Sequence, residues 1–157
     1  MRSAGELQKA LVQSPRLVAK VCVGKQALKG EHRGLLVEEK PKQARVTDSI
    51  DLDAYHHGTA PQGCRWDYLV GIGGTEAFVI AVEVHPARVN QVPVMIEKKK
   101  AAERLLKQEC GRSPVSGLWH WLASGSVDMS SAGNAKHQLS EAGIAFPKSR
   151  LCIPRQL

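Results

Sequence analysis

Residues 65–87 read RWDYLVGIGGTEAFVIAVEVHPA, and this stretch decides the fold. Trp66–Ile72 is predicted to form a strand that ends at the turn signal Gly73-Gly74. The nearly continuous apolar run Ala77–Val84 is typical of a central strand that is buried on both faces. We therefore expect a β-hairpin in the middle of a sheet.

The segments before the hairpin predict a further strand and one or two helices. Val46–Ala54 alternates between two faces, which indicates a half-buried strand. Over about Ala4–Val23 the apolar residues follow helical spacing and predict two short helices or one kinked helix. Ser3 and Glu6 form a capping box at the first start. Ser14-Pro15 marks a second start, because proline suits the first helical position.

The segments after the hairpin complete an alternating pattern. A helix, a strand, a helix and a short last strand are predicted at Asn90–Glu109, Val115–Ala123, Ser131–Glu141 and Arg150–Ile153. We expect an α/β fold with a helix-strand-strand-strand-helix-strand core and a mixed central sheet flanked by helices. Residues 1–157 fit a single domain, since domains usually hold ~100–200 residues.

Charge and composition narrow the class of protein. The chain has 22 Lys and Arg against 15 Asp and Glu, a net charge of +7, which makes nucleic acid a candidate partner. Aromatic residues are only 4%, so a base-stacking platform for single strands is poorly supported. The four cysteines contain no C-x-x-C pair, which argues against a structural zinc site. No window holds the ~18 apolar residues of a membrane helix, and no secretory signal is recognised, so we expect a cytoplasmic protein or a nuclear one.

Two acidic residues lie where a strand pattern gives no structural reason for charge. Asp67 lies in the first hairpin strand, and Glu83 lies between Val82 and Val84 in the second. Burying a carboxylate is costly unless it is paired or binds metal. Glu83 therefore either belongs to a site, reaches solvent at the strand end, or pairs with a basic side chain. His85 leaves the strand on the same face as Glu83, because side chains two apart share a face.

The register of the hairpin decides whether the two acids meet. Asp67 and Glu83 share a face only if paired residue numbers add to an even sum. A two-residue turn at Gly73-Gly74 gives an odd sum and separates them. We therefore predict an odd loop, residues 73–75 or 73–77, or a bulge that restores the parity.

The segment order and the residues RWDYLV (Arg65–Val70) and AVEVHPA (Ala81–Ala87) resemble the PD-(D/E)XK nuclease superfamily. The resemblance implies a nuclease fold, with Asp67 and Glu83 as ligands of Mg²⁺ or Mn²⁺ and a catalytic basic residue two positions after Glu83. His85 stands where a lysine is usual, and Trp66 stands where the motif has proline. Carboxylates and water are the ligands that Mg²⁺ prefers.

A lysine on the following helix is a second candidate for the missing cation. On a helical wheel Lys98 lies at the centre of an apolar stripe formed by Val94, Met95, Ala101, Ala102 and Leu105. A lysine in that place either extends to solvent or finds an anion. Some members of the superfamily carry the motif lysine on this helix, so Lys98 resembles a relocated version.

Other polar residues form weaker candidates. Asp51, Asp53, His56 and His57 have the composition of a metal cluster, although such a strand end is more often a solvated edge. Glu6 is a possible contributor from the first helix. His120, between two tryptophans, is expected to lie at the margin of the core with its hydrogen bonds satisfied.

Three functions remain open from the sequence. The first is a metal-dependent nuclease that hydrolyses phosphodiester bonds in DNA or RNA, with His85 or Lys98 orienting the attacking water. The second is a noncatalytic protein of the same fold that binds nucleic acid or a protein partner. The third is an unrelated basic α/β protein whose acids are structural. No GxSxG, Walker A, GxGxxG or HExxH pattern is present, which counts against other common enzyme classes.

Overall fold

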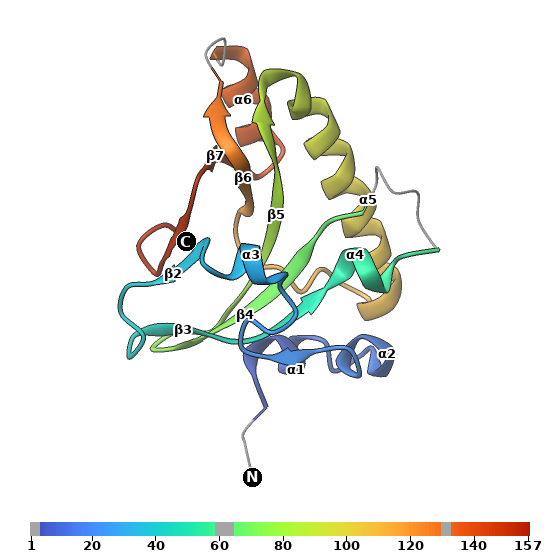
Figure 1. Ribbon diagram of the computed structural model, residues 1–157. Coiled ribbons are helices and arrows are strands. Elements are labelled where there is room, and N and C mark those ends of the chain that lie inside the picture. Colours follow the sequence, from blue (N-terminus) through green and yellow to red (C-terminus); the bar gives the residue numbers. More distant parts are fainter. Residues whose placement is uncertain (1–3, 59–64, 130–132) are drawn as a thin grey trace.

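The computed structural model describes residues 4–58, 65–129 and 133–157 and confirms the α/β class. Its main sheet has the strand order β1-β3-β4-β5-β6-β7 (Figure 1). The first four of these strands pair antiparallel, and β5, β6 and β7 pair parallel. The strands are β1 (Cys22–Val23), β3 (Ala44–Asp51), β4 (Tyr68–Gly74), β5 (Phe78–Arg88), β6 (Trp119–Asp128) and β7 (Ile144–Lys148).

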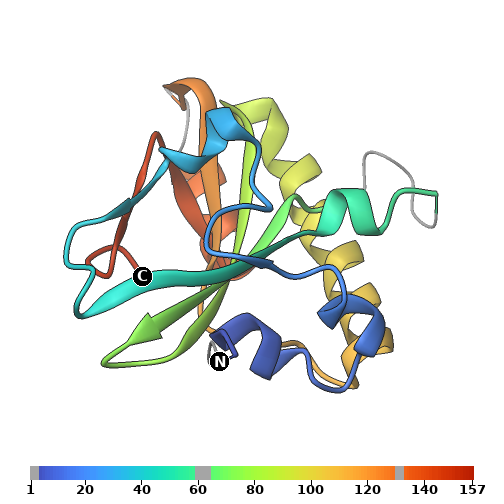
Figure 2. The ribbon, with the colours of Figure 1, turned by 60° about the horizontal axis from the view of Figure 1, so that its bottom comes forward.

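Helices cover one face of this sheet and a small second sheet covers the other (Figure 2). The small sheet pairs β2 (Leu36–Glu38) with β8 (Leu151–Ile153) in parallel. The longest described helix, α5, follows β5 through the short 3-10 helix η2. The helical elements are α1 (Glu6–Ala10), α2 (Pro15–Val18), α3 (Gly30–Arg33), α4 (Leu52–Tyr55), η2 (Val89–Gln91), α5 (Val92–Cys110) and α6 (Gly133–Glu141).

Each face of the sheet has its own apolar core. On the helical face, Leu69, Val79 and Ala81 pack with buried residues of α1, α2, α5 and α6. On the other face, Val70, Ile80 and Val82 pack under β2 and β8. Strand β5 is therefore buried on both sides, as its continuous apolar run predicts. This placement puts any odd-numbered side chain from Val79 to Ala87 beneath the helices.

The hairpin register confirms the odd loop. Tyr68 pairs with Val82 and Ile72 pairs with Phe78, so residues 73–77 form a five-residue connection between the last paired residues. The paired numbers add to an even sum, which places Asp67 and Glu83 on facing positions of the two strands. The geometric condition for a shared site is met.

The N-terminal helix is capped from a distant strand rather than by a local capping box. Ser3 lies outside the described residues, and Gly5 is the N-cap of α1. The N–H groups of Leu7 and Gln8 donate to the two carboxylate oxygens of Asp48 on β3, both at 2.9 Å. Gly71 on β4 makes this contact possible, since a Cβ there would lie 2.1 Å from Asp48 Oδ1 and 2.5 Å from the Leu7 nitrogen.

The bounds of some helices and strands differ from those that the sequence predicts. The predicted strand Val46–Ala54 ends at Asp51, whose carboxylate accepts the Ala54 N–H at 2.9 Å and starts α4 instead. Strand β6 begins at Trp119 and continues to Asp128, beyond the predicted end at Ala123. The predicted start of α6 at Ser131 lies outside the described residues.

Candidate active site

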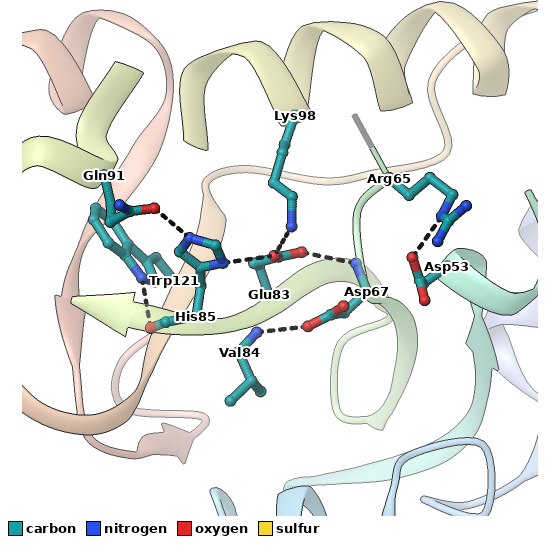
Figure 3. A network of polar contacts seen from close by, with 9 residues as sticks. All are labelled: Asp53, Arg65, Asp67, Glu83, Val84, His85, Gln91, Lys98 and Trp121. Atoms are coloured by element: carbon teal, nitrogen blue, oxygen red, sulfur yellow. Dashed lines mark hydrogen bonds and ion pairs between the residues drawn. The ribbon is translucent and has the colours of Figure 1, made fainter. Parts of the chain in front are cut away.

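Glu83 is the centre of a buried polar network beneath α5 (Figure 3). The residue is only 1% exposed. Its Oε1 accepts the backbone N–H of Asp67 at 2.9 Å, and its Oε2 pairs with the Lys98 ammonium. The Nδ1 atom of His85 lies 3.6 Å from the same Oε2. Of the alternatives that the sequence left open, contact with water is contradicted and pairing with a basic side chain is confirmed.

Asp67 faces Glu83 just before β4 begins. Its Oδ2 accepts the Val84 N–H at 2.9 Å, beyond the last hairpin pair of Tyr68 with Val82. Each acid thus takes a backbone N–H from the opposite strand at the point where the strands part. Burial, and next the charge of Glu83, raises the pKa of Asp67 to about 7. The two carboxylates therefore lie close enough to repel each other.

His85 is held between Glu83 and a residue that sequence reasoning missed. Its Nε2 lies 2.7 Å from Gln91 Oε1, at the end of η2. Its backbone carbonyl accepts the indole N–H of Trp121 at 3.2 Å. The nearby Glu83 carboxylate raises the pKa of His85, with burial opposing and Gln91 supporting the rise. No pattern in the sequence distinguishes Gln91, because its role depends on the turn that brings α5 back over β5.

Lys98 reaches the site from the buried face of α5. It is 8% exposed and shares that face with Met95, Ala101 and Ala102, as the helical wheel predicts. Val94, which the wheel places on the same stripe, is instead 37% exposed, and Leu105 is only partly buried. Its ammonium finds an anion, Glu83, and does not extend to solvent. The structure thus brings together all four residues selected from the sequence, with Asp67 and Glu83 on the hairpin, His85 on β5 and Lys98 on α5.

The acidic and histidine residues around α4 do not form the metal cluster that their composition suggests. Asp51 caps α4, and Asp53 pairs with Arg65 at 2.8 Å. His56 is buried, and burial lowers its pKa. Across residues 4–58, 65–129 and 133–157, no three His, Cys, Asp or Glu side chains gather as a metal site.

Glu6 does not join the site either. It pairs with Lys9 at 3.2 Å and lies against Gly73, at the far end of β4 from Asp67. There it lines an open groove of about 680 Å³ between α1, β1 and β3. This hollow lies at the turn end of the hairpin, whereas the four candidate residues lie at its open end, so we assign it no part in the chemistry.

His120 lies on the other face of the sheet from Glu83. It pairs in register with Val82 and is 2% exposed. Burial, and next the charge of Lys148, lowers its pKa to about 4. Its Nδ1 has no hydrogen-bond partner in the part of the chain that the structure describes, so the expectation of a fully satisfied histidine is wrong.

The donor atoms at Asp67 and Glu83 fit a hard divalent cation. Both are carboxylates, and Mg²⁺ is commonly held by one or two carboxylates together with water. Asp67 Oδ1 has no hydrogen-bond partner among the described residues, while Oδ2 is held by Val84. Burial, and next the charge of Glu83, raises the pKa of Asp67, so a cation placed between the two carboxylates would favour their ionised forms. Two protein ligands and a remainder of water are the most that the site offers.

Comparison with protein-family models, curated proteins and solved structures finds no match for this chain. No helix within the described ranges is long and apolar enough to cross a membrane. The case for a function therefore rests on the geometry of the four residues and on the order of the elements that carry them.

Proposed function

We propose that the protein is a metal-dependent nuclease that hydrolyses phosphodiester bonds in DNA or RNA. The observation that carries this proposal is the meeting of Asp67 and Glu83 where β4 and β5 part, with Lys98 and His85 against Glu83. Buried acidic and basic side chains that gather at one point occur more often at functional sites than elsewhere in a protein.

The order of elements adds independent support. With the short intervening elements left aside, helix α1, strands β3, β4 and β5, helix α5 and strand β6 occur in the order of a helix-strand-strand-strand-helix-strand core. Strand β6 runs parallel to β5 and beside it. On this order rests the resemblance to the PD-(D/E)XK nucleases, in which the acids lie on the second and third core strands. Glu83 lies on β5, and Asp67 immediately precedes β4.

Each residue has a distinct proposed role in the reaction. Asp67 and Glu83 would hold Mg²⁺ or Mn²⁺, and the cation would supply an activated water and stabilise charge on the phosphoryl group. Water attacks phosphorus, the bond to the leaving oxygen breaks, and a phosphate monoester and a hydroxyl result. His85 and Lys98 are the candidates for orienting the water. The His85 side chain is the more accessible, 20% exposed against 10% for Lys98, and Gln91 fixes its ring.

The charge balance supports a polyanionic substrate. A net charge of +7 attracts nucleic acid before any specific contact forms. With this partner, the cytoplasm or a nucleus remains the proposed location.

A noncatalytic nucleic-acid-binding or protein-binding module of the same fold is the second candidate. One observation favours it. Both acids already have structural partners, because each holds a backbone N–H of the facing strand and Glu83 is neutralised by Lys98. Residues with such contacts have a reason to be present without catalysis.

Substitution of Glu83 separates the two candidates. We expect Glu83→Gln to lower Mg²⁺-dependent cleavage of labelled DNA and RNA by a factor of about a hundred or more, since the charge that holds the cation is lost. The matched control is Glu103→Gln on α5, which removes the same charge from a residue paired with Lys99. A wild type that cleaves neither substrate with Mg²⁺ or Mn²⁺ overturns the nuclease proposal and leaves the binding module.

A further inference from the structure

The Oε2 atom of Glu83 is approached by basic side chains from two elements. Lys98 approaches it from α5, and His85 approaches it from β5. The other oxygen, Oε1, accepts the Asp67 N–H and is held against the hairpin backbone. Lys98 therefore holds Oε2 directly, while the His85 ring lies beside the same oxygen at 3.6 Å.

The charge count shows why a divalent cation and this arrangement do not combine. Two carboxylates and one ammonium give the buried group a charge of about −1 when both acids are ionised. Adding a doubly charged cation beside the ammonium brings the group to about +1 and sets two cations against one carboxylate. Two cations at contact distance within a protein repel each other more strongly than they do in water. With the ammonium gone, the same cation leaves the two acids neutralised.

The side chain of Lys98 is able to move away from Glu83 while the helix that carries it stays in place. Its ammonium is the end of a flexible four-carbon chain, and its side chain is 10% exposed, so the path to water is not sealed. The backbone of α5 is held by Met95, Ala102 and Leu106, all 0–1% exposed, and need not move with it. Movement of one side chain is enough to uncover Oε2.

We propose that Lys98 is an exchangeable internal counter-ion, which occupies Glu83 in the metal-free protein and is displaced when a divalent cation binds. This inference rests on the proposed metal site. It assigns Lys98 a role in loading the cation that is separate from any role in orienting water. Because the cation must displace a buried ion pair, the wild-type protein binds it more weakly than the two acids alone do.

Mn²⁺ titration by calorimetry, without nucleic acid, tests the exchange. Lys98→Met removes the competing ammonium, and we expect it to bind Mn²⁺ at least about tenfold more tightly than the wild type. Lys98→Arg keeps a competing cation and is expected to stay close to the wild type. Lys99→Met is the control for a general loss of positive charge, since Lys99 pairs with Glu103 and stacks over Trp119.

A second measurement on the wild type covers the case in which Lys98→Met does not fold. The ammonium hydrogens of Lys98, protected by the ion pair, give a nuclear magnetic resonance signal that Lys98→Arg assigns by its loss. We expect this signal to move or vanish in proportion to bound Mg²⁺. A signal that is unchanged at saturating Mg²⁺ overturns the exchange.

The outcomes distinguish this inference from the proposed function. Equal or weaker Mn²⁺ binding by Lys98→Met overturns the exchange and leaves the nuclease proposal standing. Tighter binding in a protein that cleaves nothing supports the exchange and overturns the nuclease. Absence of Mn²⁺ binding in every variant overturns both.

Discussion

Glu83 and Lys98 show how one residue pair can be structural and chemical at once. Both are nearly inaccessible, and each is the partner that lets the other be buried. A carboxylate that is uncompensated among apolar residues is a burden whose removal leaves folding intact or improves it. Glu83 is not uncompensated, because it is ion-paired with Lys98, and its loss leaves a buried ammonium.

A double-mutant cycle measures this coupling. We expect Glu83→Gln and Lys98→Met each to lower the free energy of unfolding by about 3 kcal/mol, since removing one partner strands the other. The double variant is expected to cost no more than either single change, a coupling of about 3 kcal/mol. Urea unfolding with a chelator present gives the four values, and additive losses contradict the ion pair.

His120 provides a pH dependence at the scale of a single residue. Its pKa falls from 6.5 to about 4 on folding, so it stays neutral in the native state. Below pH 6.5 the unfolded chain takes up a proton that the folded protein does not. The stability is therefore present above that pH, falls as the pH drops toward 4, and falls no further below it.

We expect the wild type to lose about 3 kcal/mol between pH 6.5 and pH 4 relative to His120→Phe, which cannot titrate. The opposite contribution of Asp67, whose pKa is raised, is present in both proteins and cancels in the difference. Urea unfolding across this range measures the difference. The same substitution at the exposed His137 serves as the control, and equal slopes for wild type and His120→Phe rule the assignment out.

At the scale of elements, the docking of α1 depends on the absence of a side chain at Gly71. Gly71→Ala puts a methyl group into Asp48 and the first turn of α1. Overpacking and loss of the cap together are expected to cost about 3 kcal/mol, seen as a lower urea midpoint and faster hydrogen exchange at Leu7 and Gln8. Gly125→Ala on β6, where nothing lies within 4 Å, is expected to change stability by less than about 0.5 kcal/mol. Equal effects at the two glycines contradict the model of docking.

The elements that could be predicted from sequence are those whose signal is local. The apolar run of β5 and the wheel position of Lys98 belong to single segments. The odd length of the hairpin loop followed from parity together with the assumption that Asp67 and Glu83 share a face. The cap of α1 could not be predicted, because Asp48 lies 41 residues from the N–H of Leu7. Short strands such as β1 and β7 carry too few residues for a period to show.

In the candidate site, too, the residues that could be predicted from the sequence are those with a local signal. Asp67 and Glu83 were visible as charges inside strand patterns, and His85 followed from its place two residues beyond Glu83. Gln91 was not visible, since its partner is set by the turn between β5 and α5. Nor was the contact of each acid with the N–H of the opposite strand, which depends on where the strands part.

At the scale of the whole molecule, the net charge predicts how nucleic acid is held. With +7 overall and 4% aromatic residues, binding to duplex DNA is expected to be mainly electrostatic. If about four phosphates are neutralised, raising salt from 50 to 200 mM weakens binding about a hundredfold. Fluorescence anisotropy across this range measures the slope. Binding that does not weaken as the salt concentration rises, or no binding at 50 mM salt, contradicts both nucleic-acid proposals.

The contacts of the candidate site join residues that are close to one another in the sequence, and this affects the order in which contacts form during folding. The bonds that join Asp67, Glu83, Val84 and Lys98 span 15–17 residues, whereas those that anchor α1 to β3 span 40 or 41. Closing a shorter loop costs less entropy, and contacts of low sequence separation form sooner. The hairpin and the start of α5 are therefore expected to bring Asp67, Glu83 and Lys98 together before the N-terminal helix docks on Asp48.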